Sequence, residues 1–201
     1  MNLRLVRTVS WALLGVALVA LLVMALVRRE LVADGTADEP PFYANFQLTD
    51  HAGAPRSQED FAGQWLLVFF GFANCPDICP TTLAEVAGVM DGLGDAADRV
   101  QPLCFTVDPE RDTAAELADF VPRFHPRLIG LTGTPEQVAQ TADSFHIYYD
   151  RIEEAAAPGG YTMGHSSQLF LFGPDGGYVT AWQYGTPADE IVADLLSRIG
   201  E

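Results

Sequence analysis

The sequence predicts an α/β fold in which a sheet carries helices on both faces, and three observations predict it. Continuous apolar runs at 65–72 and 100–108 are typical of strands buried on both faces. Helical patterns alternate with these runs along the chain. Residues 167–185 contain two apolar runs around Gly-Pro-Asp-Gly-Gly, which predicts a β-hairpin followed by a C-terminal helix.

The expected order of elements is β-α-β-α-β-α-β-β-α. Its strands lie at 65–72, 100–108 and 127–133 and in the hairpin 167–185. Its helices lie in TTLAEVAGVMDGLG, TAAELADFVPRF, TPEQVAQTADSF and TPADEIVADLLSRI. The first helix places Leu83, Val86, Met90 and Leu93 on one face, and Pro135 begins the third. The segment HIYYDRI alternates weakly and is a candidate strand beginning at His146, although the expected order does not include it.

The N-terminal part of the chain predicts a membrane anchor. Residues 9–27 are almost unbroken apolar sequence, and a helix of this length spans roughly 28 Å, the hydrocarbon thickness of a bilayer. Two arginines follow where a cleaved signal peptide would have small residues, which favours an uncleaved anchor. We expect a short cytoplasmic tail at 1–8, an acidic linker at 28–41 and one domain at 42–201 outside the cytoplasm.

Charge is unevenly distributed along the chain. All 27 acidic residues follow Arg29, whereas only seven of the 11 basic residues do. Such an acidic domain is a poor partner for nucleic acid, because a phosphate backbone attracts basic surfaces. It suits a basic protein partner or cations, and solubility alone is the alternative interpretation.

Cys75 and Cys79, each followed by a proline, are the main candidate site. Proline disfavours the α region for the residue before it, so we expect neither cysteine inside a helix. Pro80 suits the first helical position, which places Cys79 near the N-cap. The pair would then lie between a buried strand's end and a helix N-terminus. A helix N-terminus lowers a thiol pKa, and open α/β sheets place their sites at strand ends.

Three interpretations of this pair remain open from the residues alone. A structural disulfide would close a tiny loop and stabilise little. Dithiol–disulfide exchange is possible, although exchange motifs usually have two intervening residues rather than three. A metal site needs further ligands, and His165, in a loop leading into the hairpin, is the candidate. Cys104 is expected to be an inert core thiol. His51 lies in a polar turn and is expected to be solvated, His125 to cap a helix end, and His146 to be a partly buried ring.

Four motifs in order carry a resemblance to a known family. They are Cys75-Pro-Asp-Ile-Cys79-Pro80, TVDPERDT at 106–113, LTGTPEQV at 131–138 and YTMGHSS at 161–167. With them the chain resembles the Sco/SenC family of copper chaperones, over about 42–199 and in its N-terminal anchor. The resemblance implies a thioredoxin-like fold and a role in assembling the binuclear copper centre of cytochrome c oxidase. It also implies one copper ion, Cu(I) or Cu(II), bound by Cys75, Cys79 and His165.

The residue types agree with this implied ligand set. Thiolates favour Cu(I) and imidazole accommodates Cu(II), although zinc accepts the same ligands. The family usually has aspartate before the histidine, where this chain has Gly164, which predicts weaker or altered Cu(II) binding. Asp77 is retained between the cysteines. Met163 suits Cu(I), but we expect it to pack in the core.

The sequence therefore predicts a copper-binding protein anchored in a bacterial inner membrane, with its domain in the periplasm. It would pass copper, or electrons, to the oxidase subunit that carries the binuclear copper site. The redox state of the cysteine pair would be the switch, and a copper donor or dithiol reductant would act upstream. The main alternative is a thiol–disulfide reductase without stable copper binding. Peroxide reduction and copper sensing are lesser alternatives.

Overall fold

The computed structural model describes Gly15, Met24 and residues 42–200. The chain divides into two units, residues 1–41 and 42–201, and the second holds the fold. The predicted tail, anchor and linker at 1–8, 9–27 and 28–41 lie outside the described residues, apart from Gly15 and Met24. Within the described part of the chain, no helix is both long and apolar enough to cross a membrane.

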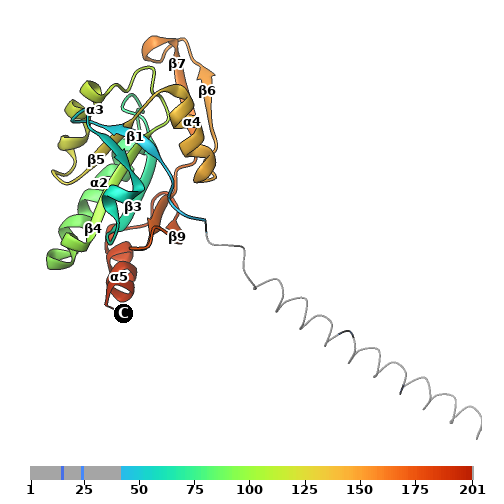
Figure 1. Cartoon of the computed structure of the whole chain (residues 1–201). Coiled ribbons are helices and arrows are strands. Elements are labelled where there is room, and N and C mark those ends of the chain that lie inside the picture. The colour runs from blue at the N-terminus through green and yellow to red at the C-terminus, as the bar shows by residue number, and fades with distance from the viewer. Residues whose placement is uncertain (1–14, 16–23, 25–41, 201) are drawn as a thin grey trace, which may run out of the picture. The chain divides into compact units, whose positions relative to one another are not determined.

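A seven-stranded mixed sheet with the order β2-β1-β5-β4-β3-β8-β9 forms the centre of the domain (Figure 1). Its strands are β1 (Gln47–Asp50), β2 (Pro55–Ser57), β3 (Trp65–Gly71), β4 (Val100–Thr106), β5 (Ile129–Thr132), β8 (Leu169–Phe172) and β9 (Tyr178–Trp182). The strands β3, β4 and β5 run parallel, and β8 pairs antiparallel with β3 and β9. The predicted central strands and the C-terminal hairpin are confirmed, with ends shifted by up to three residues.

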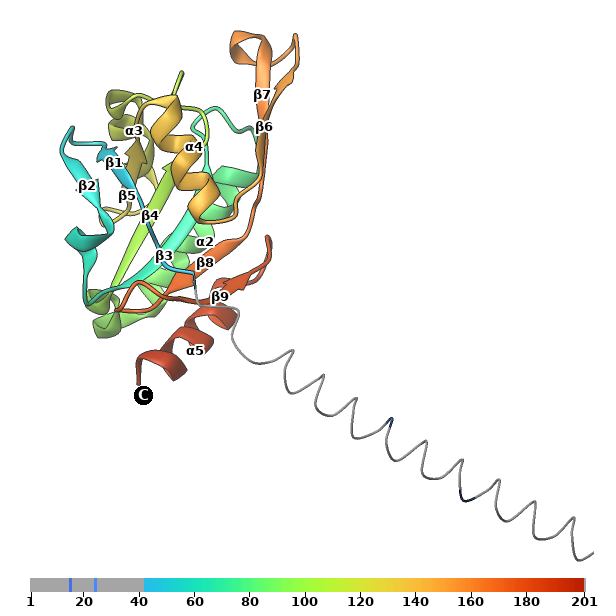
Figure 2. The same ribbon diagram turned by 45° about the vertical axis from the view of Figure 1, so that its right-hand side comes forward.

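Helices cover both faces of this sheet, as predicted. They are α2 (Ile78–Gly92), α3 (Ala114–Phe120), α4 (Pro135–Ser144) and α5 (Ala188–Ile199). Gly92 of α2 packs against Val192 of α5, and Gly130 of β5 lies under Leu117 of α3. These three helices share one face, and α4 crosses the other (Figure 2). Short 3-10 helices lie at Gln58–Phe61, Gly94–Arg99, Val121–Arg123 and Pro158–Gly160.

An aromatic cluster fixes the sheet to α4. Phe145, at the end of α4, contacts the rings of Phe70, Phe105 and Phe172 at centroid distances of 5.3, 5.4 and 5.1 Å. All four side chains are at most 1% exposed. Burial of one such ring stabilises the fold by about 1.5–3 kcal/mol. The carboxyl end of β3, where the cysteine loop begins, is therefore held by a well-packed core.

A second, two-stranded sheet was not expected from the sequence. It consists of β6 (Tyr149–Glu153) and β7 (Tyr161–His165), which pair antiparallel and form what we call the β6–β7 arm. The arm extends beyond the main sheet (Figure 2). Its first strand is mostly exposed and charged, so it lacks the apolar alternation that predicts a strand. The expected loop position of His165 is wrong, since His165 is the last residue of β7.

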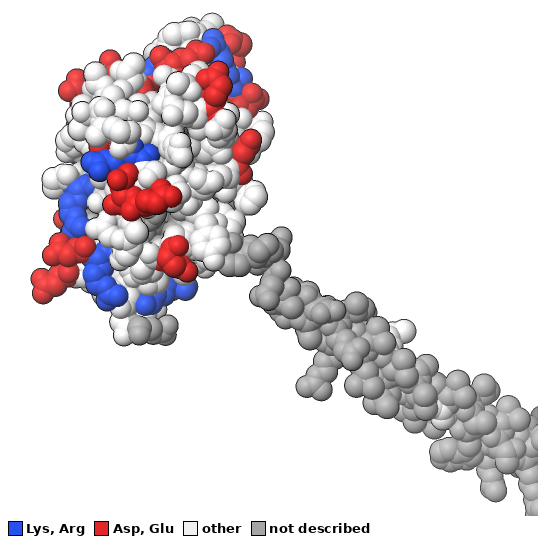
Figure 3. Space-filling view, in the orientation of Figure 1, with Lys and Arg blue, Asp and Glu red and all other residues white. Residues whose placement is uncertain are grey.

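The strands β1 and β2 were also missed. Both are short, lie at one edge of the sheet, and β2 begins with a proline, which is tolerated at such an edge. On the face shown in Figure 3, acidic and basic side chains are interspersed, with uncharged surface between them. The excess of acidic residues does not form one continuous patch on this face, and a basic partner stays a prediction.

Candidate metal centre

The loop between β3 and α2 presents the two cysteines. A Cβ atom at Gly71 would meet the Phe69 ring at 2.6 Å and the Cys79 Sγ at 3.0 Å, so glycine allows Cys79 to pack closely against the strand. The expectation that Cys79 lies outside the helix is wrong, because it is the second residue of α2, after the N-cap Asp77. Pro80 is tolerated there because the first N–H groups of a helix have no partner within the helix.

A cysteine sulfur accepts one of these free N–H groups. The backbone N–H of Cys79 donates to the Cys75 Sγ at 3.4 Å. The side-chain hydrogen bond from Cys79 lowers the pKa of Cys75 to about 4, with a smaller contribution from His165. The same hydrogen bond, followed by burial and by the charge of Cys75, raises the pKa of Cys79. The reduced pair therefore holds one proton, on Cys79, and one thiolate, on Cys75.

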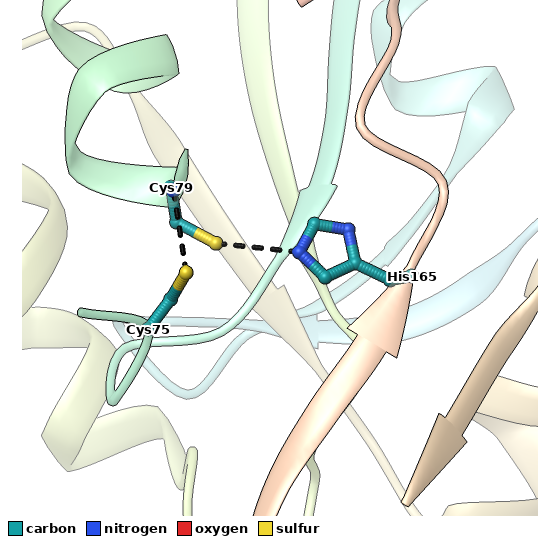
Figure 4. Close-up of side chains that lie close together, drawn as sticks. All are labelled: Cys75, Cys79 and His165. Carbon is teal, nitrogen blue, oxygen red and sulfur yellow. Dashed lines mark hydrogen bonds between the residues drawn. The ribbon is translucent and has the colours of Figure 1, made fainter. Parts of the chain in front are cut away.

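His165 approaches this pair from the end of the β6–β7 arm (Figure 4). Its Nε2 lies 3.5 Å from the Cys79 Sγ, and its Nδ1 lies 2.8 Å from the carbonyl oxygen of Ser166. A carbonyl only accepts hydrogen bonds, so Nδ1 carries a proton, and Nε2 is the ring nitrogen that faces the cysteines. The rings of Phe69 and Phe72 meet the imidazole edge-on at 6.0 and 5.9 Å. The ring is thus oriented for ligation.

The three predicted ligand residues come together in space. Their ligand atoms, two Sγ and one imidazole nitrogen, all lie within 4.8 Å of one another. Cys79 is fully buried, whereas Cys75 and His165 are partly exposed. Two sulfurs and one nitrogen form a soft donor set that suits copper and also zinc. The arrangement can hold one metal ion with one side open to solvent.

Gly164 lies on the face of β7 away from the imidazole. It pairs with Asp150 of β6, and a Cβ atom there would meet the Ile152 Cδ1 at 3.2 Å. Successive residues of a strand point to opposite faces, so an aspartate in this position would not point toward the ring of His165. The carbonyl of Ser166 serves as the orienting partner in this chain.

The remaining candidates have structural surroundings. Cys104 is buried in β4, where burial raises its pKa to about 12, and Met163 packs against the core. Both agree with the sequence-based expectation. His51 Nδ1 accepts the N–H of Gly130, His125 Nδ1 accepts that of Arg127, and the His146 ring packs against Phe42.

The sequence analysis gave no role to the residues of the TVDPERDT motif. The Asp112 Oδ2 accepts the N–H of Ala73, in the cysteine loop, at 3.0 Å, and the hydroxyl of Thr106 at 2.7 Å. Asp112 is fully buried, which raises the pKa of its carboxyl to about 6. The sequence signal that could have identified Asp112 was the group of charged residues directly after a buried strand, because a buried carboxylate needs specific hydrogen-bond partners.

Comparisons with known proteins agree with this site. The SCO1/SenC family model matches residues 34–200. The mitochondrial SCO2 homolog of Mus musculus is 42% identical over 157 residues, which cover 77% of this chain and 61% of that protein. The chain spans between 52% and 61% of the length of the mitochondrial SCO1 and SCO2 homologs of mouse, cattle and human.

Two solved structures extend the likeness to the fold. Bradyrhizobium japonicum ScoI, solved with copper bound, superposes with a TM-score of 0.72 at 35% identity, covering 78% of this chain and 98% of that one. BsSco, a member of the Sco family of cytochrome c oxidase assembly proteins with a disulfide switch, superposes with a TM-score of 0.63 at 27% identity. It covers 81% of this chain and 96% of its own. The predicted thioredoxin-like fold is confirmed.

Proposed function

Because this chain belongs to the SCO1/SenC family, we propose that it binds one copper ion and delivers it to the binuclear copper site of cytochrome c oxidase. The ligands are Cys75, Cys79 and His165. The observation that carries this proposal is the meeting of the three ligand atoms within 4.8 Å, although the histidine is 86 positions from the nearer cysteine. The copper-bound structure of the Bradyrhizobium relative supports the choice of metal.

Copper is the cargo in this proposal, and the site suits both its uptake and its release. The Cys75 thiolate is ready to ligate, and ligation by Cys79 releases the one remaining proton of the pair. An incoming ligand from the oxidase subunit reaches the partly exposed Cys75 and His165 before the buried Cys79. Release therefore proceeds by stepwise ligand exchange, with Cys79 as the last ligand to leave.

The oxidation state of the cysteines controls loading. When an oxidant takes two electrons and the pair loses its remaining proton, the sulfurs form a disulfide that cannot ligate as two thiolates. A dithiol reductant, a further expected partner, restores the competent state. The disulfide switch of BsSco supports such control.

Membrane attachment belongs to the same proposal. Residues 9–27 form a single-pass anchor in the bacterial inner membrane, the tail 1–8 is cytoplasmic, and the linker 28–41 places the domain 42–201 in the periplasm. The length and apolar composition of 9–27 support this arrangement. The anchor would keep the copper site close to a membrane-bound oxidase.

A thiol–disulfide reductase is the second candidate function. The lowered pKa of Cys75 beside the raised pKa of Cys79 favours it, because a thiolate next to a protonated thiol is the state that attacks a client disulfide. In this alternative the protein prepares the cysteines of the oxidase copper site and holds no stable copper. His165 is dispensable for dithiol exchange but not for the three-ligand site.

The experiment that tests the proposal compares wild type with His165→Ala and, as a control, His125→Ala. Each reduced protein is titrated anaerobically with Cu(I) against a competing chelator, and with Cu(II) by absorption spectroscopy. We expect one equivalent of copper and a thiolate-to-Cu(II) charge-transfer band in wild type and in His125→Ala. The band should disappear in His165→Ala while dithiol cycling persists. Cycling without copper retention in wild type would favour the reductase.

A further inference from the structure

One turn of the chain contacts both the segment that carries the cysteines and the β6–β7 arm, which carries His165. Residues 106–113, the segment TVDPERDT that joins β4 to α3, form what we call the 106–113 turn. On the cysteine side, the N–H of Val107 donates to the carbonyl of Gly71 at 2.9 Å. The buried Asp112 accepts the N–H of Ala73, two positions before Cys75. The turn therefore fixes the start of the cysteine loop.

On the histidine side, Arg111 connects the same turn to the β6–β7 arm. Its Nη1 donates to the carbonyl oxygens of Pro158 and Tyr161, at 2.6 and 3.0 Å. Tyr161 is the first residue of β7, the strand that ends at His165. The guanidinium lies 3.7 Å from the centroid of the Tyr161 ring, with its carbon over the ring. Arg111 thus contacts both the backbone and the side chain of Tyr161, the residue at which β7 begins.

Asp108 holds the guanidinium in place. One of its carboxylate oxygens pairs with the Arg111 Nε, and the other accepts the Tyr161 hydroxyl at 2.9 Å. Asp108 is 2% exposed. A planar guanidinium presents its donors in a fixed fork, so it can serve the carboxylate and the two carbonyls at once, which an ammonium cannot do with the same geometry.

We propose that Arg111 is a positioning residue, which holds the β6–β7 arm on the 106–113 turn and thereby sets His165 against Cys75 and Cys79. The two strands of the arm pair with each other and are not part of the seven-stranded sheet. Their placement depends on contacts such as those that Arg111 makes at the start of β7. The consequence for copper rests on the function proposed above, whereas the placement of His165 is a property of the metal-free protein.

Arg151 provides a matched control within the same cluster. Its guanidinium carbon also lies 3.7 Å from the centroid of the Tyr161 ring. Among the hydrogen bonds of the described residues, however, it donates only to the exposed carboxylates of Glu110 and Glu153. Arg151→Gln therefore removes one positive charge and the cation–π contact with Tyr161, as Arg111→Gln does. It leaves intact the hydrogen bonds of Arg111 to the backbone and the contact of its guanidinium with the Phe72 ring at 5.8 Å.

The test uses the full-length reduced protein in detergent, with Arg111→Gln, Arg111→Lys and Arg151→Gln beside wild type. In the metal-free state, the nuclear Overhauser effect between the ring protons of His165 and Phe69 reports the place of the histidine, since the two rings lie 6.0 Å apart. Phe72 is less suitable as the reporter because Arg111 contacts its ring. With Cu(II), the charge-transfer band and the nitrogen coupling in the electron paramagnetic resonance spectrum report its ligation. Thermal unfolding is measured for every variant.

We expect Arg111→Gln to lose the His165–Phe69 effect and to bind Cu(II) roughly 10- to 100-fold more weakly, as after loss of a partner that orients a ligand. Cu(I), which two thiolates hold, should change much less. Arg111→Lys should fall between, and Arg151→Gln should stay within about twofold of wild type because its ion pairs are exposed.

Two outcomes would overturn the proposal. One is a wild-type proton contact and a wild-type Cu(II) spectrum in folded Arg111→Gln. The other is an equal loss in Arg151→Gln, which would assign the effect to charge at the Tyr161 ring. If Arg111→Gln does not fold, Arg111→Lys decides by the same criteria. If His165→Ala keeps the Cu(II) spectrum, the proposed ligand set fails, while the metal-free measurement still decides the role of Arg111.

Discussion

The two halves of the candidate metal centre are built differently. The cysteines lie on a short loop between β3 and α2, against a strand that is almost wholly buried in the middle of the sheet. His165 lies at the end of the β6–β7 arm, whose first strand is mostly exposed. Core packing places the cysteines. In our proposal, the polar contacts of Arg111 at the start of β7 place the histidine.

This difference suggests how one site can hold copper and also release it. A rigid pair of sulfurs gives a constant binding platform, because packed cores resist displacement. A ligand on an arm outside the main sheet can withdraw at lower cost, because few buried contacts must break. The histidine side is therefore where ligand exchange with a partner should begin.

The largest expected effect is on the cysteine side. Cys75→Ser removes a thiolate, the ligand that Cu(I) prefers. We expect Cu(I) affinity to fall by more than the roughly 10- to 100-fold that accompanies loss of an orienting partner. Competition titration with a Cu(I) chelator measures this. Cys104→Ala is the matched control, since it removes a buried thiol outside the site. Equal loss in both variants would show that copper binding depends on thiol number rather than on this pair.

The sequence could predict the cysteine side because local signals determine it. The apolar run of β3, the helical periodicity of α2 and the spacing of the cysteines all lie within thirty positions. Even there, the predicted start of α2 was wrong, because the steric preference of a residue before proline does not prevent helical geometry in the first turn of a helix.

The histidine side depends on contacts that no local pattern reveals. The charged strand β6 gave only a weak strand signal and β7, with its glycine, gave none. Arg111 reaches carbonyls about 50 positions away. The resemblance to a family identified His165, but it did not indicate the arm that carries it or the residue that holds the arm. The pairing of distant segments depends on contacts between side chains. The partners of these side chains are known only from the folded structure.

The pH dependence of copper binding should also distinguish the two sides. The lowered pKa of Cys75 and the raised pKa of Cys79 leave one proton on the free pair near neutral pH. Copper binding by two thiolates displaces it, so Cu(I) affinity should rise about tenfold per pH unit between about pH 6 and pH 8. Chelator competition at several pH values measures the slope.

His165→Ala sharpens this test, because the displaced proton belongs to the cysteines. We expect the same slope for Cu(I) in that variant, with lower absolute affinity. A slope near two protons would show that Cys75 is protonated in the free protein. A flat profile would show that both thiols are already ionised, and either result would contradict the assignment of a single thiolate.

The smallest expected effect is at Gly164, on the outer face of the arm. Gly164→Asp introduces a carboxylate directly before the histidine, but the side chain would lie near Ile152 and away from the imidazole. Ile152 is 49% exposed and can move aside. We therefore expect a change in unfolding free energy within about 0.5 kcal/mol and no change in the Cu(II) band. Gly164→Ala, which adds the same Cβ without charge, is the control.

A shifted Cu(II) band in Gly164→Asp alone would mean that a carboxylate at position 164 does influence the ring of His165. The carbonyl of Ser166 would then not be a sufficient partner for that ring. An unshifted band would leave the orientation of His165 to Ser166 and to the contacts that hold the arm.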